Sequence, residues 1–326
     1  MVPALVLTAG LATRLRPLSL VRAKAAVPMA GQPLVHRILR WLGAAGVTDT
    51  VLNLHHLPHT ITRLVGDGSQ LGLCVRYSWE TPVLGSAGGP RRALPLLLNP
   101  EPRTANPNLE PGTFLIVNGD TLTDLDVRAL VADHVDSGAL VTMAVTPNAE
   151  PARYGGVAVA EDGTVTGFVR RGSQESSWHF VGVQVAEPAA FADVPANTPY
   201  ETVARLYPDL IAARLGAVRA HRAAVEFLDV GTPGDYLASA LRLAERESDA
   251  GTASDAARVS PTARVERSIL WDGVEVADGV FLRECVVADG ARVPAGTSWH
   301  GVTIRRAEGE LTPGERRVDD LAIATL

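Results

Sequence analysis

The first thirty-odd residues, Val2 to Leu34, constrain the fold of this chain most. An apolar run at Ala4–Leu7 predicts a buried strand, and it ends abruptly in Thr8-Ala9-Gly10, a loop of small residues. Such a loop lets backbone N–H groups approach an anion closely. Arg14 and Lys24 follow in the same stretch and add positive charge. By themselves, these residues suit a phosphate-binding loop and an ordinary strand–loop–helix unit with surface cations about equally well.

Apolar strands alternate with helical patterns along the first half of the chain. Strands are expected at 4–7, 50–54, 74–78, 113–117 and 139–145, and helices at 34–45, 59–65, 88–98 and 127–136. This alternation predicts an α/β fold, a Rossmann-like, mostly parallel mixed sheet with helices on both faces. Ligands of such sheets bind beyond the carboxyl ends of the strands. The loops after the first and fourth strands are therefore candidates for one shared site.

Two further segments could serve a nucleotide. Leu84–Gly89 reads LGSAGG, and its small residues leave room for a flat base against the backbone. Taken alone, the segment is better explained as a plain loop and helix start. Asn118-Gly119-Asp120 follows a buried strand, where an exposed carboxylate could ligate Mg²⁺. The same three residues also form a good turn, so this motif is a weak signal without its context.

Composition and charge exclude several classes of protein. The net charge is −6 and the isoelectric point about 5.8. These values argue against a general partner of nucleic acid or of a membrane surface, which needs a basic face. Cys74 and Cys285 form neither a disulfide framework nor a zinc motif, as is typical of a reducing cytosol. The chain enters a strand directly without a charged leader and has no apolar run of membrane-spanning length, so a cytoplasmic location is expected.

The C-terminal quarter follows a different pattern. Residues 248–257, SDAGTASDAA, predict a linker between a first domain at 1–247 and a second at 258–326. Beyond the linker, apolar residues recur about every six positions, at Val259, Val265, Ile269, Val274, Val280, Val286 and Ala291. This spacing favours a short parallel β-helix over another kind of small β-domain. Because a short solenoid has open ends, we expect it to join copies of the chain into a homo-oligomer.

The N-terminal stretch resembles the signature of the sugar-1-phosphate nucleotidyltransferases, the NDP-sugar pyrophosphorylases. That signature runs roughly LAGGxGTRLxPLT, then PKP, then GKP or GQP. The matching residues are Ala9, Gly10, Thr13, Arg14, Leu15, Pro17, Leu18, Lys24, Pro28, Gly31 and Pro33. Ala12 stands where the family has Gly, and Ala23 and Ala25 replace the prolines beside Lys24. An Ala at position 12 needs either a negative φ or acceptance of the cost of left-handed backbone.

The resemblance continues through the rest of the chain. LGSAGG matches the family's LGTAGG, which contacts the base, and the family's GD, RYGVV and WxDVGTP have counterparts at 119–120, 153–157 and 229–233. The implied nucleotide-binding residues are Ala9, Gly10, Thr13, Arg14, Gly85, Ala87, Gly88, Asn118 and Gly119. The implied sugar-phosphate-binding residues are Gly155, Arg171 and Gly182.

One segment departs from the family pattern. FVRRG at 168–172 stands in place of FxEKP, so Arg171 takes the position of the Lys that holds the sugar phosphate. Arg170 replaces a Glu that accepts a sugar hydroxyl, and an Arg cannot accept a hydrogen bond. On an extended strand the two arginines would point to opposite faces, so only Arg171 is expected to face the sugar.

The resemblance implies the reaction. A sugar-1-phosphate oxygen would attack the α-phosphorus of a nucleoside triphosphate, giving an NDP-sugar and pyrophosphate. Asp120 and Asp229 would hold Mg²⁺, while Arg14 and Lys24 would offset charge on the phosphates. Mannose-1-phosphate with GTP is favoured, because the motifs and the trailing left-handed β-helix resemble mannose-1-phosphate guanylyltransferase-like proteins.

Two alternatives remain open at this level. Glucose-1-phosphate or an amino-sugar-1-phosphate with UTP or dTTP would use much the same motifs. Ala12, Ala23 and Arg170 also leave open a regulatory subunit that binds a nucleotide sugar without turnover.

Overall fold

The computed structural model describes residues 2–98, 112–247 and 251–326. Packing divides the chain into two compact units, which are described separately. The first contains residues up to Gly10 together with His36–Leu228, and the second contains Leu11–Val35 together with Asp229–Leu326. The second unit therefore includes the loop after the first strand as well as the C-terminal part. The predicted linker begins at 248–250, outside the described residues, and the predicted boundaries at 247 and 258 stay a prediction.

The first unit is built on a nine-stranded sheet. Its strands are β1 (Ala4–Leu7), β4 (Asp49–Leu54), β5 (Cys74–Trp79), β6 (Phe114–Asn118), β8 (Val141–Pro147), β9 (Gly156–Val159), β10 (Val165–Val169), β11 (Trp178–Ala186) and β12 (Val218–Arg222). The order is β10-β9-β11-β6-β1-β4-β5, with β8 beside β11 and β12 beside β8. Strands β6, β1, β4 and β5 run parallel, and β11 pairs antiparallel with β6. The predicted mixed, mostly parallel sheet is confirmed.

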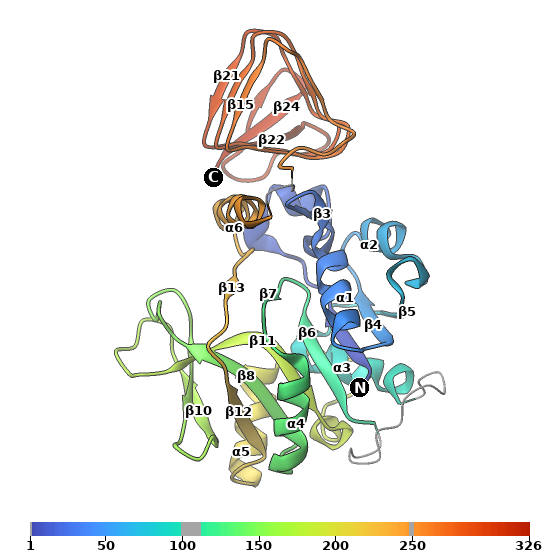
Figure 1. Ribbon diagram of the computed structural model, residues 1–326, viewed down its shortest axis with the longest axis vertical. Helices are drawn as coiled ribbons and strands as arrows, with labels where there is room; N and C mark the ends of the chain where they lie inside the picture. The colour runs from blue at the N-terminus through green and yellow to red at the C-terminus, as the bar shows by residue number, and fades with distance from the viewer. Residues whose placement is uncertain (1, 99–111, 248–250) are drawn as a thin grey trace. The chain divides into compact units, whose positions relative to one another are not determined.

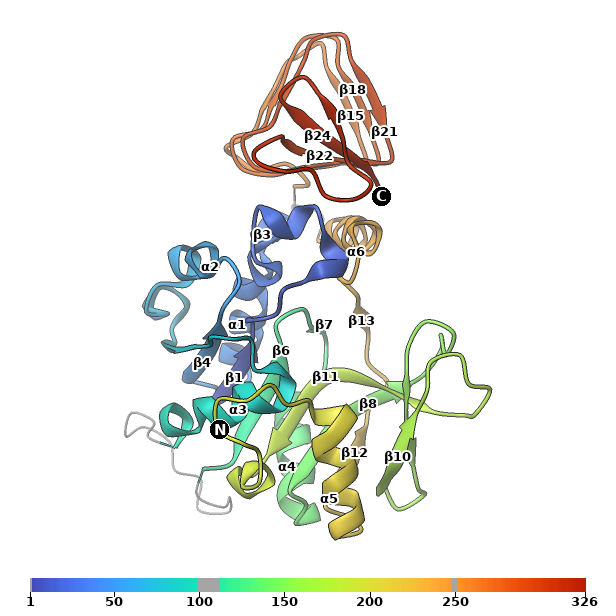
Figure 2. The same ribbon diagram turned by 180° about the vertical axis from the view of Figure 1, so that it is seen from behind.

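Helices cover both faces of this sheet. They are α1 (Leu34–Ala44), α2 (Pro58–Val65), α3 (Gly85–Leu97), α4 (Val127–Ser137) and α5 (Tyr207–Ala213). Figures 1 and 2, taken from opposite sides, show α1 and α4 over one face and α3 and α5 over the other. The central strands are buried on both faces and therefore read as continuous apolar runs. In β1, for example, Ala4, Leu5 and Val6 are fully buried.

The second unit combines three irregular turns, one helix and a solenoid. The N-terminal part holds the short 3₁₀ turns Thr13–Leu15, Leu18–Leu20 and Lys24–Ala26, followed by the hairpin of β2 (Pro28–Met29) and β3 (Gln32–Pro33). Both residues of the hairpin loop, Ala30 and Gly31, have positive φ. This is the geometry of a tight two-residue hairpin, in which Gly is favoured. Helix α6 (Pro233–Arg246) precedes the solenoid.

The C-terminal segment is a parallel β-helix, as predicted, and its coils form a triangle in Figure 1. Its coil strands are β14 (Arg258–Val259), β15 (Arg264–Glu266), β16 (Ile269–Leu270), β17 (Glu275–Val276), β18 (Phe281–Arg283), β19 (Val286–Val287), β20 (Arg292–Val293), β21 (Ser298–His300) and β22 (Val302–Arg306). Successive coils pair in parallel, as Val265 pairs with Leu282 and Leu282 with Trp299. The side chains of Val276, Leu282 and Val293 fill the interior and are at most 3% exposed.

One end of the solenoid is closed by the chain itself. Strands β23 (Arg316–Val318) and β24 (Leu321–Thr325) form a hairpin, and β24 pairs antiparallel with β22. Under this cap, Arg305 donates two hydrogen bonds of 2.7 Å to the carboxylate of Glu315. Their side chains are 5% and 0% exposed. Burial alone would raise the pKa of Glu315, but hydrogen bonds from Arg305 and Thr312 outweigh it and hold this pKa below its usual range.

Among the described residues, no helix is long and apolar enough to cross a membrane.

The buried Arg305–Glu315 pair yields the first prediction. In Arg305→Met the Glu315 carboxylate stays buried without its partner, so the cap should lose about 3–5 kcal/mol. In the matched variant Arg306→Met, the lost pair with Glu308 is exposed, and the change should stay within about 0.5 kcal/mol. Hydrogen exchange of the β22–β24 amides measures both.

The same pair sets a pH dependence. Because the folded pKa of Glu315 is lowered, its contribution is complete above the unfolded-state pKa of about 4.3. The contribution is lost as the pH falls through the lower folded value. Equal protection of these amides in the two variants at neutral pH would contradict this account of the cap.

Candidate functional site

The first unit brings three predicted segments to one edge of the sheet. In the parallel register, Leu7 lies beside both Asn53 and Asn118. Asn53 in turn lies beside Ser78. The loops that follow β1, β4, β5 and β6 therefore leave the sheet side by side, at the carboxyl ends where such folds bind ligands. The predicted convergence of the loops after the first and fourth strands is observed.

Two residues that sequence reasoning missed hold this edge together. The Asn53 Oδ1 atom accepts hydrogen bonds from the backbone N–H groups of Thr8 at 2.6 Å and Ala9 at 3.2 Å. Its Nδ2 group donates to Glu80 Oε1 at 2.7 Å, and Glu80 Oε2 accepts from Leu84 N at 2.8 Å. The Asn53–Glu80 pair thus fastens the loop after β1 to the segment before α3. The available signal was a polar residue near the end of each strand, since Asn53 is the last residue but one of β4 and Glu80 directly follows β5.

The turn after β6 depends on a close backbone approach. The Gly119 N–H donates to the Leu7 carbonyl at 3.0 Å, and a Cβ atom at position 119 would overlap that oxygen. Only Gly fits here. Gly182 has a φ of +83°, and a Cβ there would overlap the Thr121 hydroxyl. Gly119 and Gly182 are thus both required by packing around the turn that carries Asp120, whereas the contact of Gly182 with a sugar phosphate stays a prediction.

The LGSAGG segment begins α3 at Gly85, three residues before the expected start at Gly88. The N–H groups of Ala87 and Gly88 donate to the Tyr200 carbonyl at 2.9 and 3.1 Å. A Cβ at Gly85 would overlap the side chain of Glu201. The small residues therefore allow Tyr200 and Glu201 to approach the start of α3 closely. Their contact with a nucleotide base stays a prediction.

The prediction that Arg170 and Arg171 lie on an extended strand and point to opposite faces is wrong, whereas the sugar-phosphate role of Arg171, which came from the family motif, stays a prediction. Strand β10 ends at Val169, and Arg170 begins a turn in which its carbonyl accepts from Ser173 N at 3.1 Å. Gly172, at φ +84°, turns the chain there. The alternation of faces does not apply to a turn, so both arginines are exposed. Gly155 directly precedes β9 and is also exposed.

An aromatic cluster lies near this turn in the first unit. The ring of His179 is 4.5 Å from that of Tyr154 and 5.0 Å from that of Phe227, measured between ring centroids. Strand β11 carries His179, and the two-residue strand β13 (Phe227–Leu228) carries Phe227. Strand β13 pairs with β7 (Leu122–Thr123), which follows the turn of Asp120. The rings are tilted to one another, by 48° between Tyr154 and His179 and by 56° between His179 and Phe227, so they pack edge against face as a cluster.

The second unit carries the predicted cations. Arg14 is exposed on the 3₁₀ turn Thr13–Leu15, and Lys24 begins the turn Lys24–Ala26 and is half-buried. The turn of Arg14 begins at Ala12, whose φ of 47° and ψ of 45° are left-handed. The Ala12 carbonyl accepts from Leu15 N at 3.0 Å and from Ser19 Oγ at 2.9 Å. Ala12 therefore adopts a left-handed conformation that Gly, the residue of the family signature, would adopt without steric cost.

Asp229 belongs to the second unit as well. It follows β13 and precedes α6, whose N-terminus is closed by a capping box between Thr232 and Asp235. The Ser239 hydroxyl of α6 donates to the Asp229 carbonyl at 2.6 Å. Pro233 occupies the first turn of the helix, as the motif predicted. These contacts hold the backbone of Asp229 against α6.

The predicted site residues thus fall into two groups. Those of the first unit are Ala9, Gly10, Gly85, Ala87, Gly88, Asn118, Gly119, Asp120, Gly155, Arg171 and Gly182, and those of the second are Thr13, Arg14, Lys24 and Asp229. Within the described parts of the chain, no cluster of three or more His, Cys, Asp or Glu side chains could hold a metal ion. The assigned roles of these residues stay predictions.

Comparison with known proteins identifies the family. The profile described as Nucleotidyl transferase matches residues 3–246. The chain therefore belongs to the Nucleotidyl transferase family and is a nucleotidyltransferase.

Curated relatives match over most of their length. A mannose-1-phosphate guanylyltransferase of Mycobacterium tuberculosis is 28% identical over 306 residues, covering 90% of this chain and 82% of the relative. A probable mannose-1-phosphate guanylyltransferase 2 of Oryza sativa subsp. japonica is 30% identical over 318 residues, with 93% and 82% covered. A UTP--glucose-1-phosphate uridylyltransferase of Synechocystis is 25% identical, with 98% and 86% covered.

Solved structures share the fold. HddC from Yersinia pseudotuberculosis superposes with a TM-score of 0.62 at 22% identity, covering 74% of this chain and 99% of HddC. A putative glucose-1-phosphate thymidylyltransferase from Bacillus anthracis gives a TM-score of 0.63 at 15% identity, with 77% and 97% covered. At these identities the likeness concerns the fold alone.

The left-handed Ala12 yields a prediction about stability. Left-handed backbone costs an L-residue about 1–2 kcal/mol, and Gly avoids this cost while adding freedom to the unfolded chain. Ala12→Gly should therefore raise the free energy of unfolding by about 0.5–1 kcal/mol. Ala23→Gly, at a φ of −55°, should lower it by about 0.5–1 kcal/mol. Urea denaturation of both variants measures the difference, and shifts of the same sign would argue against strain at Ala12.

Proposed function

We propose that this chain transfers a nucleotidyl group from a nucleoside triphosphate to a sugar-1-phosphate. An oxygen of the sugar phosphate attacks the α-phosphorus, the bond from that phosphorus to the bridging oxygen breaks, and pyrophosphate leaves with the bond electrons. The observation that carries the proposal is the convergence of the loops after β1 and β6 at the carboxyl edge of the sheet, in a chain whose family match spans residues 3–246.

The favoured substrates are GTP and mannose-1-phosphate. Several relatives with more than nine-tenths of this chain aligned carry the name mannose-1-phosphate guanylyltransferase, and their match extends past the catalytic motifs. The uridylyltransferase relative supports the alternative, glucose-1-phosphate with UTP. Arg170 stands where the family has a Glu that accepts a sugar hydroxyl, and an Arg cannot accept a hydrogen bond. Another acceptor must select the sugar.

The chemistry requires alignment and neutralisation of charge rather than a protein nucleophile. The sugar phosphate is already a competent nucleophile, so the rate depends on holding it in line with the leaving pyrophosphate. Arg14 presents a guanidinium from an exposed turn, and Lys24 an ammonium from the next turn but one. We assign both to the phosphates of the triphosphate, where positive charge stabilises the oxyanions of the transition state. The Asn53–Glu80 pair keeps the loop of Thr8 and Ala9 in place.

The donor set suits magnesium. Asp120 and Asp229 are partly exposed carboxylates, and Mg²⁺ favours one or two such ligands together with phosphate oxygens and water. We assign both side chains to this ion. When bound, it would offset the charge of the triphosphate and of the attacking phosphate.

A substrate panel tests the proposal. Pyrophosphate release is measured with GTP, UTP and dTTP, each against mannose-1-phosphate, glucose-1-phosphate and an amino-sugar-1-phosphate. We expect the highest kcat/KM for GTP with mannose-1-phosphate. Highest turnover with UTP or dTTP would select the alternative substrates. Thermal stabilisation by the nucleotides without pyrophosphate release from any pair would contradict the proposed reaction.

The two carboxylates give a specific prediction. Asp120→Asn and Asp229→Asn should each nearly abolish turnover and leave the fold intact, because a neutral amide is a poorer ligand for a hard cation. Asp136→Asn, an exposed carboxylate of α4, is the matched control and should keep full activity. Near-normal turnover of either variant at millimolar Mg²⁺ would remove that residue from the metal site. Circular dichroism verifies the fold of each protein.

A further inference from the structure

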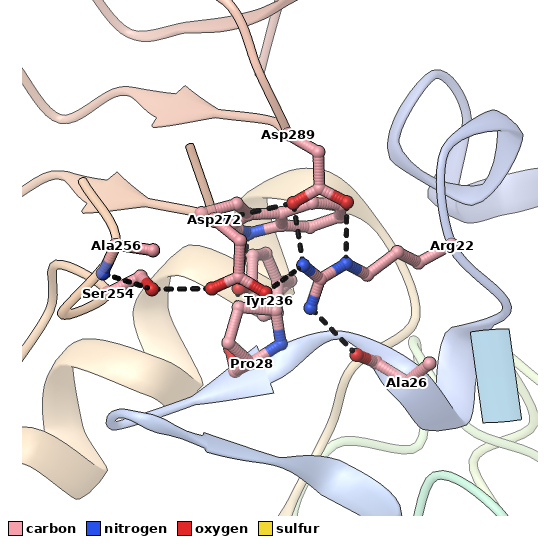
Figure 3. Close-up of polar contacts among 9 residues, drawn as sticks. Arg22, Ala26, Pro28, Tyr236, Ser254, Ala256, Asp272 and Asp289 are labelled. Atoms are coloured by element: carbon pink, nitrogen blue, oxygen red, sulfur yellow. Dashed lines mark hydrogen bonds and ion pairs between the residues drawn. The ribbon is translucent and has the colours of Figure 1, made fainter. Parts of the chain in front are cut away.

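The loop of the predicted cations is tied to the β-helix by one arginine. Arg22 lies between the turns Leu18–Leu20 and Lys24–Ala26, and its side chain is only 11% exposed. Its Nε and Nη2 atoms each donate to the carboxylate of Asp289 at 2.7 Å, and Nη2 also donates to Asp272 at 2.5 Å (Figure 3). The remaining Nη1 lies 3.5 Å from the Ala26 carbonyl. One guanidinium thus joins the turn of Lys24 to the solenoid.

The two carboxylates come from equivalent positions of neighbouring coils. Asp272 and Asp289 are 17 residues apart, and Asp272 N donates to Asp289 Oδ1 at 3.2 Å. Burial raises the pKa of Asp289, whereas hydrogen bonds from Ser254 and Arg22 outweigh burial and lower that of Asp272. Without Arg22, the two carboxylates, whose side chains are 57% and 30% exposed, would lie close together without their shared cation. The two coils therefore place their carboxylates where a single guanidinium group can donate hydrogen bonds to both.

An aromatic chain makes a second connection at the same place. The Arg22 guanidinium carbon lies 5.3 Å from the ring centroid of Trp271, a fully buried residue of the β-helix. Trp271 Nε1 donates to the Tyr236 hydroxyl at 3.0 Å, and this hydroxyl donates to the Pro28 carbonyl at 2.6 Å. Burial raises the pKa of Tyr236, so it stays a neutral donor. Helix α6, which carries Tyr236, also holds the backbone of Asp229.

We propose that Arg22 is a positioning residue, through which the β-helix fixes the loop that carries Arg14 and Lys24. The inference rests on the proposed function of those two cations. Under this proposal the β-helix contributes to the reaction by holding the loop of the two cations. A β-helix that served only as an appendage or only for assembly would not do so. The turn of Lys24 is short, and the Val27 N–H closes it by donating to the Lys24 carbonyl at 3.3 Å. Short turns of this kind are stable only when tertiary contacts hold them.

The direction of the effect follows from the chemistry. Arg14 and Lys24 act on charge that develops in the transition state, so their displacement lowers kcat more than it weakens sugar-phosphate binding. A displacement of about 1 Å can cost about 10²-fold in rate. Arg22→Gln should therefore lower kcat by about 10- to 100-fold, with the KM for the sugar-1-phosphate within about 2-fold of wild type.

A matched control separates this role from general stabilisation. Arg267 also joins the β-helix to α6, through Glu245 at 3.4 Å, but it is 56% exposed and lies outside the loop. Arg267→Gln should keep wild-type kcat. Arg22→Lys keeps the charge but loses the fork, so it should recover part of the lost rate. Because Arg22 acts through the two carboxylates, adding Asp272→Asn and Asp289→Asn to Arg22→Gln should lower kcat no further.

Hydrogen exchange of the full-length protein makes the test independent of turnover. Amides of residues 13–27 should exchange faster in Arg22→Gln, while those of β1, β4 and β6 keep wild-type protection. If the wild type shows no turnover, the proposed function fails, yet this exchange pattern still decides whether Arg22 holds the loop. Wild-type protection of residues 13–27 together with wild-type kcat would overturn the inference. If Arg22→Gln does not fold, Asp289→Asn carries the same comparison, with faster exchange expected in that loop.

Discussion

The parallel pairing of β6, β1, β4 and β5 is the constraint on which the site of the first unit depends. Parallel pairing places the carboxyl ends of these strands at one edge, so their loops leave together. Strands β6, β1 and β4 are buried on both faces, so their backbone must satisfy its hydrogen bonds within the sheet. Polar side chains then gather where the strands end. Asn53 is such a side chain, and it accepts from two N–H groups of the loop after β1.

Small residues in the signature motifs have a role in packing, in addition to any role in binding a ligand. Gly119 lets the turn after β6 approach the Leu7 carbonyl, and Gly85 admits Glu201 beside the start of α3. The same glycine can therefore be required by the fold before any substrate is considered. Ala12 shows the reverse case, because the left-handed turn survives there without Gly. The left-handed conformation at position 12 therefore does not require the Gly of the motif. The turn forms although Ala12 departs from the family pattern.

The second unit shows how a solenoid can stabilise a distant loop. Repeating coils place identical positions in register, so Asp272 and Asp289 converge on one point without any irregularity in the helix. A single arginine then satisfies both carboxylates, and the fork of donors fixes its orientation. One end of the solenoid is closed by the chain's own hairpin and the buried Arg305–Glu315 pair. The solenoid is therefore capped by its own chain at this end, and the expected role of the β-helix in a homo-oligomer stays a prediction.

The alternating α/β sheet, the β-helix and the family could be predicted from the sequence, because hydrophobic period, turn residues and motif order are local properties. The sequence also placed Asp120 and Asp229 after strands. Only the tertiary structure decided that Arg171 lies in a turn, since the end of β10 depends on its pairing with β9. It alone revealed the Asn53–Glu80 pair and the contact of Arg22 with Asp289, 267 residues away. Such pairs leave no local pattern, because folding brings the partners together.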